Sequence, residues 1–219
     1  LNMSPQNKQL RRRIVDMICR GREGHIPSAF SIVDIVAEVY ARMGPTDHFV
    51  LSKGHGCAAL YAVLEARGIL PPSALDAYGT FTGILGGHPD RTKVPGVEAS
   101  TGSLGHGLPI AAGMALGYKL QGRPDKVICL VGDGECHEGA IWETALVAAG
   151  RGLTNLCVIV DRTCTASAPF VVVNTSRSAP AATLSDRASA RLSVMVISFW
   201  PVVPEKARSA PELSVMVPV

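Results

Sequence analysis

The final part of this 219-residue sequence lacks two residue types that the rest of the chain uses freely. All 22 glycines and all six histidines lie at or before residue 152, and residues 163–219 contain neither. Average glycine usage of ~7% would give about four glycines in a stretch of that length. Two interpretations stay open for it: a poorly ordered extension, or out-of-frame or unrelated sequence joined after Arg162. We therefore predict a domain over residues 1–162, incomplete at its C-terminal side, followed by an atypical tail over 163–219. In this tail, "LSVMV" occurs at 192–196 and again at 213–217, and both segments are apolar enough to form short strands.

Other absences exclude whole classes of protein. The formal net charge is only +3 and basic residues are scattered, so no nucleic-acid-binding stripe is present. We interpret the one basic run, at 11–13, as a solvated helix face. No apolar run reaches the ~18 residues that a membrane span needs. None of the six cysteines forms a C-x-x-C pair, and the zinc spacing H-E-x-x-H is missing. Because Cys129 and Cys157 lie in apolar strand patterns, we interpret them as buried thiols of a reducing compartment and predict a cytoplasmic protein.

Apolar periodicity predicts an α/β fold, a parallel sheet flanked by helices. Helices are predicted over 6–20, 31–41, 57–67, 73–78, 108–120 and 138–151, and strands over 49–52, 126–131 and 155–161. The last strand–helix–strand unit has the spacing of a right-handed parallel crossover. Between these elements lies a long loop at 82–100, and long loops in compact domains are usually functional.

The stretch "VGDGECHEGAIWE" places Gly132-Asp133-Gly134 at the end of a buried strand. Ligands of open parallel sheets bind beyond the carboxyl ends of the strands, and flanking glycines let the backbone approach a phosphate. A strand-to-helix turn with Asp133 as an N-cap explains the motif equally well. These residues alone therefore leave a metal-binding carboxylate and a simple turn both open.

Glycine and histidine also gather in other loops. The segment "STGSLGHG" at 100–107 leads into an apolar helix and offers several backbone N–H groups, without the lysine of a Walker motif. Four of the six histidines stand next to glycine, namely His25, His55, His88 and His106. Histidines can donate hydrogen bonds and move protons near neutral pH. We interpret the remaining two, His48 and His137, as ordinary surface residues.

Together these segments resemble a known family. "GHIPSAFSIVDIVAEVY", "DHFVLSKGHGCAALYAVL", "GGHPD", "STGSLGHGLPIAAGMALGYKL" and "VGDGECHEGAIWETALVAAGRGLTNLCVIVD" occur in the order and spacing of the thiamine-diphosphate-binding domain of transketolases, over about residues 6–162. The resemblance is greater to the N-terminal subunit of split transketolases than to the long single-chain form. Deoxyxylulose-phosphate synthase and the dehydrogenase E1 components share the G-D-G motif but fit the histidine loops less well.

The resemblance implies thiamine diphosphate and a divalent cation, Mg²⁺ or Ca²⁺, as cofactors. Asp133 would bind the cation, as suits a hard oxygen ligand. The family's second ligand is the asparagine of a "D-x-N" segment, whereas this chain has Asp161-Arg162-Thr163. The third ligand is a backbone carbonyl, here that of Thr165. Because the Thr163 hydroxyl is a poorer cation ligand than an amide oxygen, we expect a weakened metal site.

Other roles follow from the same resemblance. Gly132, Gly134 and His55 would contact the diphosphate, and Gly102 and Leu104 would line the aminopyrimidine. The sugar hydroxyls and proton movements would fall to His25 and His88. Glu138 matches an acid that the family buries at its subunit interface.

The implied activity is transfer of a two-carbon ketol unit from a ketose phosphate to an aldose phosphate, with the cofactor as electron sink. Only diphosphate-side motifs are present, so a second polypeptide, a pyrimidine-binding C-terminal transketolase subunit, must complete the site in a homo- or hetero-oligomer. The alternatives are a sister thiamine-diphosphate enzyme and a catalytically dead product.

Overall fold

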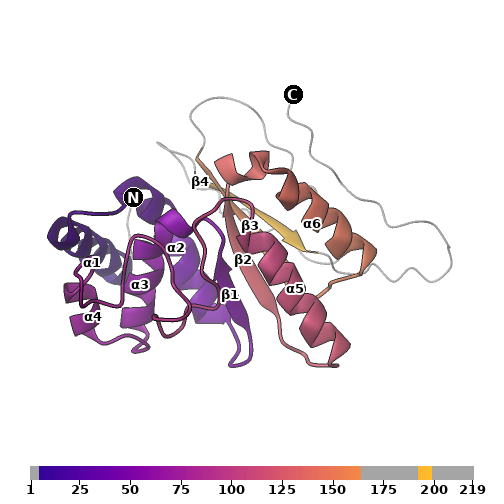
Figure 1. Cartoon of the computed structure of the whole chain (residues 1–219), viewed down its shortest axis with the longest axis horizontal. Coiled ribbons are helices and arrows are strands. Elements are labelled where there is room, and N and C mark those ends of the chain that lie inside the picture. Colours follow the sequence, from indigo (N-terminus) through magenta and orange to yellow (C-terminus); the bar gives the residue numbers. More distant parts are fainter. Residues whose placement is uncertain (1–4, 164–191, 199–219) are drawn as a thin grey trace.

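A computed structural model of the chain describes residues 5–163 and 192–198. In it, a small sheet lies between two groups of helices (Figure 1). The first group is α1 (Pro5–Gly21), α2 (Ile26–Arg42), α3 (Cys57–Ala66) and α4 (Pro72–Asp76), and the second is α5 (Gly107–Leu120) and α6 (Gly139–Gly150). This is the α/β fold with flanking helices that the sequence predicts.

The sheet has the order β1-β2-β3-β4, with strands β1 (His48–Leu51), β2 (Val127–Gly132), β3 (Leu156–Thr163) and β4 (Leu192–Ser198). The first three strands are parallel, which confirms the predicted crossover. β4 pairs antiparallel with β3, with Val160 opposite Met195. One of the two "LSVMV" segments is thus a strand, and the other lies outside the described residues.

Side chains of the parallel strands alternate between two apolar cores. The core shared with α1–α4 contains Phe49, Leu51, Leu130 and Ile159. The core shared with α5 and α6 contains Val50, Cys129, Val131, Val158 and Val160. Since both faces are covered, the strands are apolar almost throughout, as buried parallel strands are.

One helix begins well before its predicted start, and two short helices of the structure are absent from the sequence-based prediction. α2 begins at Ile26 rather than near residue 31, because Pro27 occupies its first turn, where a fixed φ favours a helix. Two short 3-10 helices, η1 (Gly54–Gly56) and η2 (Gly134–His137), lie in glycine-containing loops whose sequences show no helical period. Among the helices of the described residues, none is long and apolar enough to cross a membrane.

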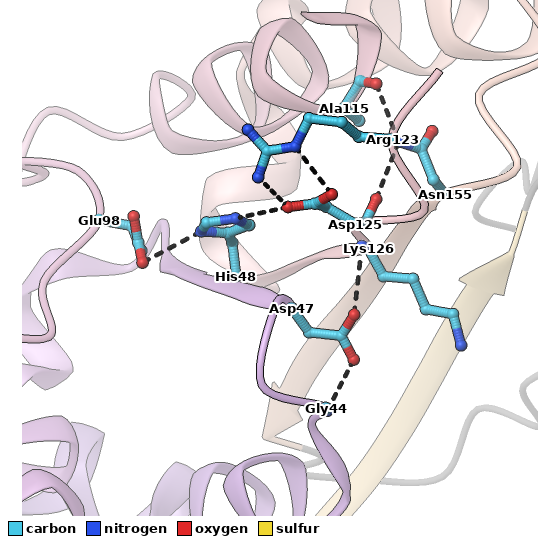
Figure 2. A network of polar contacts seen from close by, with 9 residues as sticks. All are labelled: Gly44, Asp47, His48, Glu98, Ala115, Arg123, Asp125, Lys126 and Asn155. Atoms are coloured by element: carbon cyan, nitrogen blue, oxygen red, sulfur yellow. Dashed lines mark hydrogen bonds and ion pairs between the residues drawn. The ribbon is translucent and has the colours of Figure 1, made fainter. Parts of the chain in front are cut away.

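The interpretation of His48 as an ordinary surface residue is wrong. Its side chain is only 19% exposed, with Nδ1 3.1 Å from Glu98 Oε1 and Nε2 3.5 Å from Asp125 Oδ1 (Figure 2). The ring also stacks on Tyr118, with centroids 4.8 Å apart, and Arg123 donates to Asp125. His48 starts β1, and it meets these acids only because the fold brings the loops before β1, β2 and α5 together at the amino end of the sheet.

The basic run at 11–13 is likewise more than a solvated face. Arg11 donates two hydrogen bonds to Asp34, of 2.8 and 2.7 Å, and Arg13 forms an ion pair with Glu65 at 2.7 Å. Only Arg12 of the three is exposed. The run therefore ties α1 to α2 and α3.

Candidate functional site

The carboxyl ends of β1, β2 and β3 bring several predicted site residues together with a lysine and an aspartate that were given no role from the sequence. Lys53 and His55 follow β1, Gly132-Asp133-Gly134 ends β2, and Asp161 lies beside Gly132 near the end of β3. The backbone N–H of Asp133 donates to the carbonyl of Asp161 at 2.9 Å. Residues distant in sequence thus meet where open parallel sheets bind ligands.

A buried ion pair lies beside the G-D-G segment. Lys53 Nζ is 2.6 Å from Asp161 Oδ2, and the two side chains are 7% and 2% exposed. Ser31 Oγ donates to the same carboxylate oxygen at 2.7 Å, while Asp161 Oδ1 is buried without a hydrogen-bond partner in the described part of the chain. The lysine stem passes over Gly132, because a methyl group built there would lie 3.7 Å from Lys53 Cβ and Cδ. Sequence reasoning missed this pair, for which the only signal is an acid ending an apolar strand.

Three of the four glycine-flanked histidines come together. The rings of His25 and His55 are 5.8 Å apart, edge to face, and the His88 ring lies 3.1 Å from a methyl group built on Gly102. Burial lowers the pKa of His55 below its usual 6.5, and the charges of Lys53, His25 and His88 lower it further. His55 is therefore held toward its neutral form, able to donate from one ring nitrogen and accept at the other.

Close backbone contacts explain two of the loop glycines. A methyl group on Gly54 would come within 2.7 Å of the Thr101 carbonyl, and one on Gly107 would lie 2.5 Å from Ser52 Cα. The Thr101 hydroxyl donates to the Leu51 carbonyl at 2.6 Å. The loop at 100–107, which carries Gly102 and Leu104, is thus pressed against the end of β1.

Asp133 does cap the short helix η2, since its Oδ1 accepts from the Gly134 N–H at 2.8 Å. The turn interpretation is therefore correct as local geometry. A methyl group on Gly134 would meet no atom of the described residues within 4 Å, so they leave the space beside this backbone open. Thr163 ends β3, but its side chain and all of Thr165 lie outside the described residues. Within the described ranges, no group of three or more His, Cys, Asp or Glu could by itself hold a metal ion.

The acids after the G-D-G segment differ in burial. Glu138 is exposed, and its Cβ lies 2.8 Å from a methyl group built on Gly105. Glu135, which the sequence did not single out, is only 2% exposed. Its carboxylate accepts hydrogen bonds from three separate segments. One of them is the Gly132 N–H, at 3.1 Å, so that donor is already engaged within the chain.

Comparison with known proteins decides which family this arrangement represents. Residues 5–167 match the family described as "Transketolase, thiamine diphosphate binding domain". The chain belongs to this transketolase family. The membership confirms the resemblance predicted over residues 6–162.

Among its relatives in the transketolase family, one subunit of the apulose-4-phosphate transketolase of Phocaeicola vulgatus is 39% identical over 167 residues, or 72% of this chain and 59% of that protein. The 6-deoxy-6-sulfo-D-fructose transketolase subunit of Clostridium sp. is 34% identical, over 74% and 62% of the two chains. The crystal structure of Campylobacter jejuni transketolase superimposes with a TM-score of 0.66 and 30% identity, over 72% of this chain and 28% of that one. The chain thus spans about 60% of the split-subunit relatives.

Proposed function

We propose that this chain is the diphosphate-binding subunit of a transketolase-type enzyme, which transfers a two-carbon ketol unit from a ketose phosphate to an aldose phosphate. The observation that carries the proposal is the gathering of three loop histidines, a buried lysine and the G-D-G segment at the carboxyl ends of three parallel strands. The family match adds thiamine diphosphate as the cofactor. The apulose and sulfofructose relatives support sugar phosphates or related sugars as substrates.

The side chains and backbone at this end of the sheet suit a diphosphate. The Lys53 ammonium, paired with Asp161, and the His55 ring would lie beside it, and the open side of Gly134 would leave room for a phosphate oxygen. Asp133 would hold Mg²⁺ or Ca²⁺ with its carboxylate, joined by Thr163 and the Thr165 carbonyl. Gly132 would line the site through atoms other than its N–H, which Glu135 already binds.

The remaining predicted residues would orient the organic parts of cofactor and substrate. Gly102 and Leu104 would lie against the aminopyrimidine, on the loop pressed onto β1. When bound, thiamine diphosphate supplies an electron sink for breaking the carbon–carbon bond. His25 and His88 are exposed near His55, where they would bind sugar hydroxyls and hold or release a proton at a ring nitrogen.

A partner subunit would complete the site. The apulose relative is itself named as a subunit, which indicates a second chain in that protein. Here α5 and α6 expose large apolar side chains, with Ile110 41%, Trp142 40%, Leu146 56% and Val147 54% exposed. Glu138 is exposed at the start of α6, as an acid destined for a subunit interface would be in a single chain. We propose that a pyrimidine-binding C-terminal transketolase subunit covers this surface and that the chain alone is inactive.

The test mixes the purified chain with xylulose 5-phosphate, ribose 5-phosphate, thiamine diphosphate and Mg²⁺, with and without a C-terminal transketolase subunit. Ketol transfer only in the mixture supports the proposal. Transfer by the chain alone contradicts the need for a partner. Cofactor binding without transfer to any sugar pair would favour a sister thiamine-diphosphate enzyme, and no cofactor binding would favour a catalytically dead product.

A further inference from the structure

One buried acid near the site has no part in the proposed chemistry. Glu135 lies on η2 and is 2% exposed. Its Oε1 accepts from the Ser52 hydroxyl at 2.5 Å and from the Gly105 N–H at 2.9 Å, while Oε2 accepts from the Gly132 N–H at 3.1 Å. Within the described residues it forms no ion pair, so its three partners are all neutral donors.

The three donors belong to three different loops. Ser52 directly follows β1, Gly105 lies in the glycine-rich loop before α5, and Gly132 ends β2. Each loop carries residues proposed to touch the cofactor: His55 after the first, Leu104 in the second and Asp133 after the third. One carboxylate therefore bonds every loop that the diphosphate and the aminopyrimidine would contact.

A carboxylate is suited to this position because it only accepts hydrogen bonds, through two oxygens at a fixed spacing. A glutamine would present an NH₂ group to at least one donor, and that donor would then be buried without a partner. The backbone of Gly105 is closely surrounded. Gly105 has φ +83°, and a methyl group there would lie 2.8 Å from Glu138 Cβ.

We propose that Glu135 is a positioning residue of the cofactor site, whose carboxylate fixes the three loops relative to one another before a ligand binds. Its negative charge opposes a nearby diphosphate, so its net contribution to binding must come from holding the loops. The part of this proposal that concerns cofactor affinity depends on the proposed function. The part that concerns the loops does not.

The test compares the full chain with Glu135→Gln and with Glu143→Gln, a matched change at an exposed glutamate of α6. Amide hydrogen exchange at Gly105 and Gly132 should become at least about tenfold faster in Glu135→Gln and stay unchanged in the control. The dissociation constant for thiamine diphosphate with Mg²⁺ should rise about tenfold in Glu135→Gln. Ser52→Ala removes one donor but leaves the carboxylate, so it should show a smaller change in both measurements.

Unchanged exchange at Gly105 and Gly132 would overturn the positioning role. So would exchange that is faster throughout the chain while the affinity of the folded protein stays the same, because that result describes a merely structural acid. Failure of the wild-type chain to bind the cofactor would instead contradict the proposed function, and the exchange at the two glycines would still decide the role of Glu135.

Discussion

The loops at the two ends of the parallel sheet are held together by different kinds of contact. At the amino end, loops meet through polar side chains, with His48 between Glu98 and Asp125, and Arg123 on Asp125 (Figure 2). At the carboxyl end, loops meet through glycine backbone, a buried lysine and buried acids. The carboxyl end carries the G-D-G segment and the paired rings of His25 and His55, and Asp161 Oδ1 there is buried without a hydrogen-bond partner among the described residues. We propose that the first network stabilises the fold and that the second binds the ligand.

The largest expected effect concerns the buried ion pair at the carboxyl end. Lys53→Met would leave Asp161 as a buried carboxylate without its cation, and we expect a loss of about 3–5 kcal/mol in the free energy of unfolding. Lys93→Met removes an exposed partner of Asp90, with the Lys93 side chain 64% exposed, and should cost less than about 1 kcal/mol. Urea unfolding of both variants measures the difference. Equal losses would remove the distinction between a buried and an exposed pair on which the comparison depends.

A smaller effect is expected at the metal site. Thr163→Asn would supply an amide oxygen in place of a hydroxyl, and we expect about tenfold tighter Mg²⁺-dependent binding of thiamine diphosphate. Thr154→Asn makes the same change at an exposed position just before β3, at the opposite end of the strand, and should change nothing. Calorimetric titration checks both. No gain from Thr163→Asn at saturating Mg²⁺ would show that Thr163 does not face the cation.

The smallest effect concerns acid stability at the amino end. The hydrogen bonds from Arg123 lower the pKa of Asp125 from its usual 3.8. A lowered carboxyl pKa stabilises the fold above the unfolded value, and this contribution disappears as pH falls through the folded value. In Arg123→Met the folded pKa returns toward the unfolded value of 3.8, so the variant should be less stable near neutral pH and should lose less stability than the wild-type chain as pH falls. Unfolding midpoints measured across the acid range check this, with Arg42→Met, an exposed pair on α2, as the control. If Arg123→Met and the wild-type chain lose stability equally as pH falls, the pairing of Arg123 with Asp125 does not contribute to stability.

Much of this arrangement can be predicted from local sequence, and the reasons for the exceptions are physical. Continuous apolar strands and the G-D-G segment have local signals, so the parallel sheet and the place of Asp133 are predictable. The environments of His48 and Glu135 are not, because their partners come from loops up to 83 positions away, brought near only by folding. The predicted roles of Thr163 and Thr165 depend on the resemblance alone, since the chain departs from the family pattern at that point.

The most direct measurement titrates the full chain with thiamine diphosphate and Mg²⁺, beside one variant from each end of the sheet. Asp133→Ala should weaken Mg²⁺-dependent binding by about 100-fold or more, because loss of a direct ligand should cost at least as much as the roughly 10–100-fold that loss of an outer-shell partner costs. His48→Leu should lower the unfolding midpoint and leave the dissociation constant unchanged. Two results would contradict the assignment of the carboxyl end as the cofactor site. One is an equal loss of cofactor affinity in both variants, and the other is unchanged affinity in Asp133→Ala.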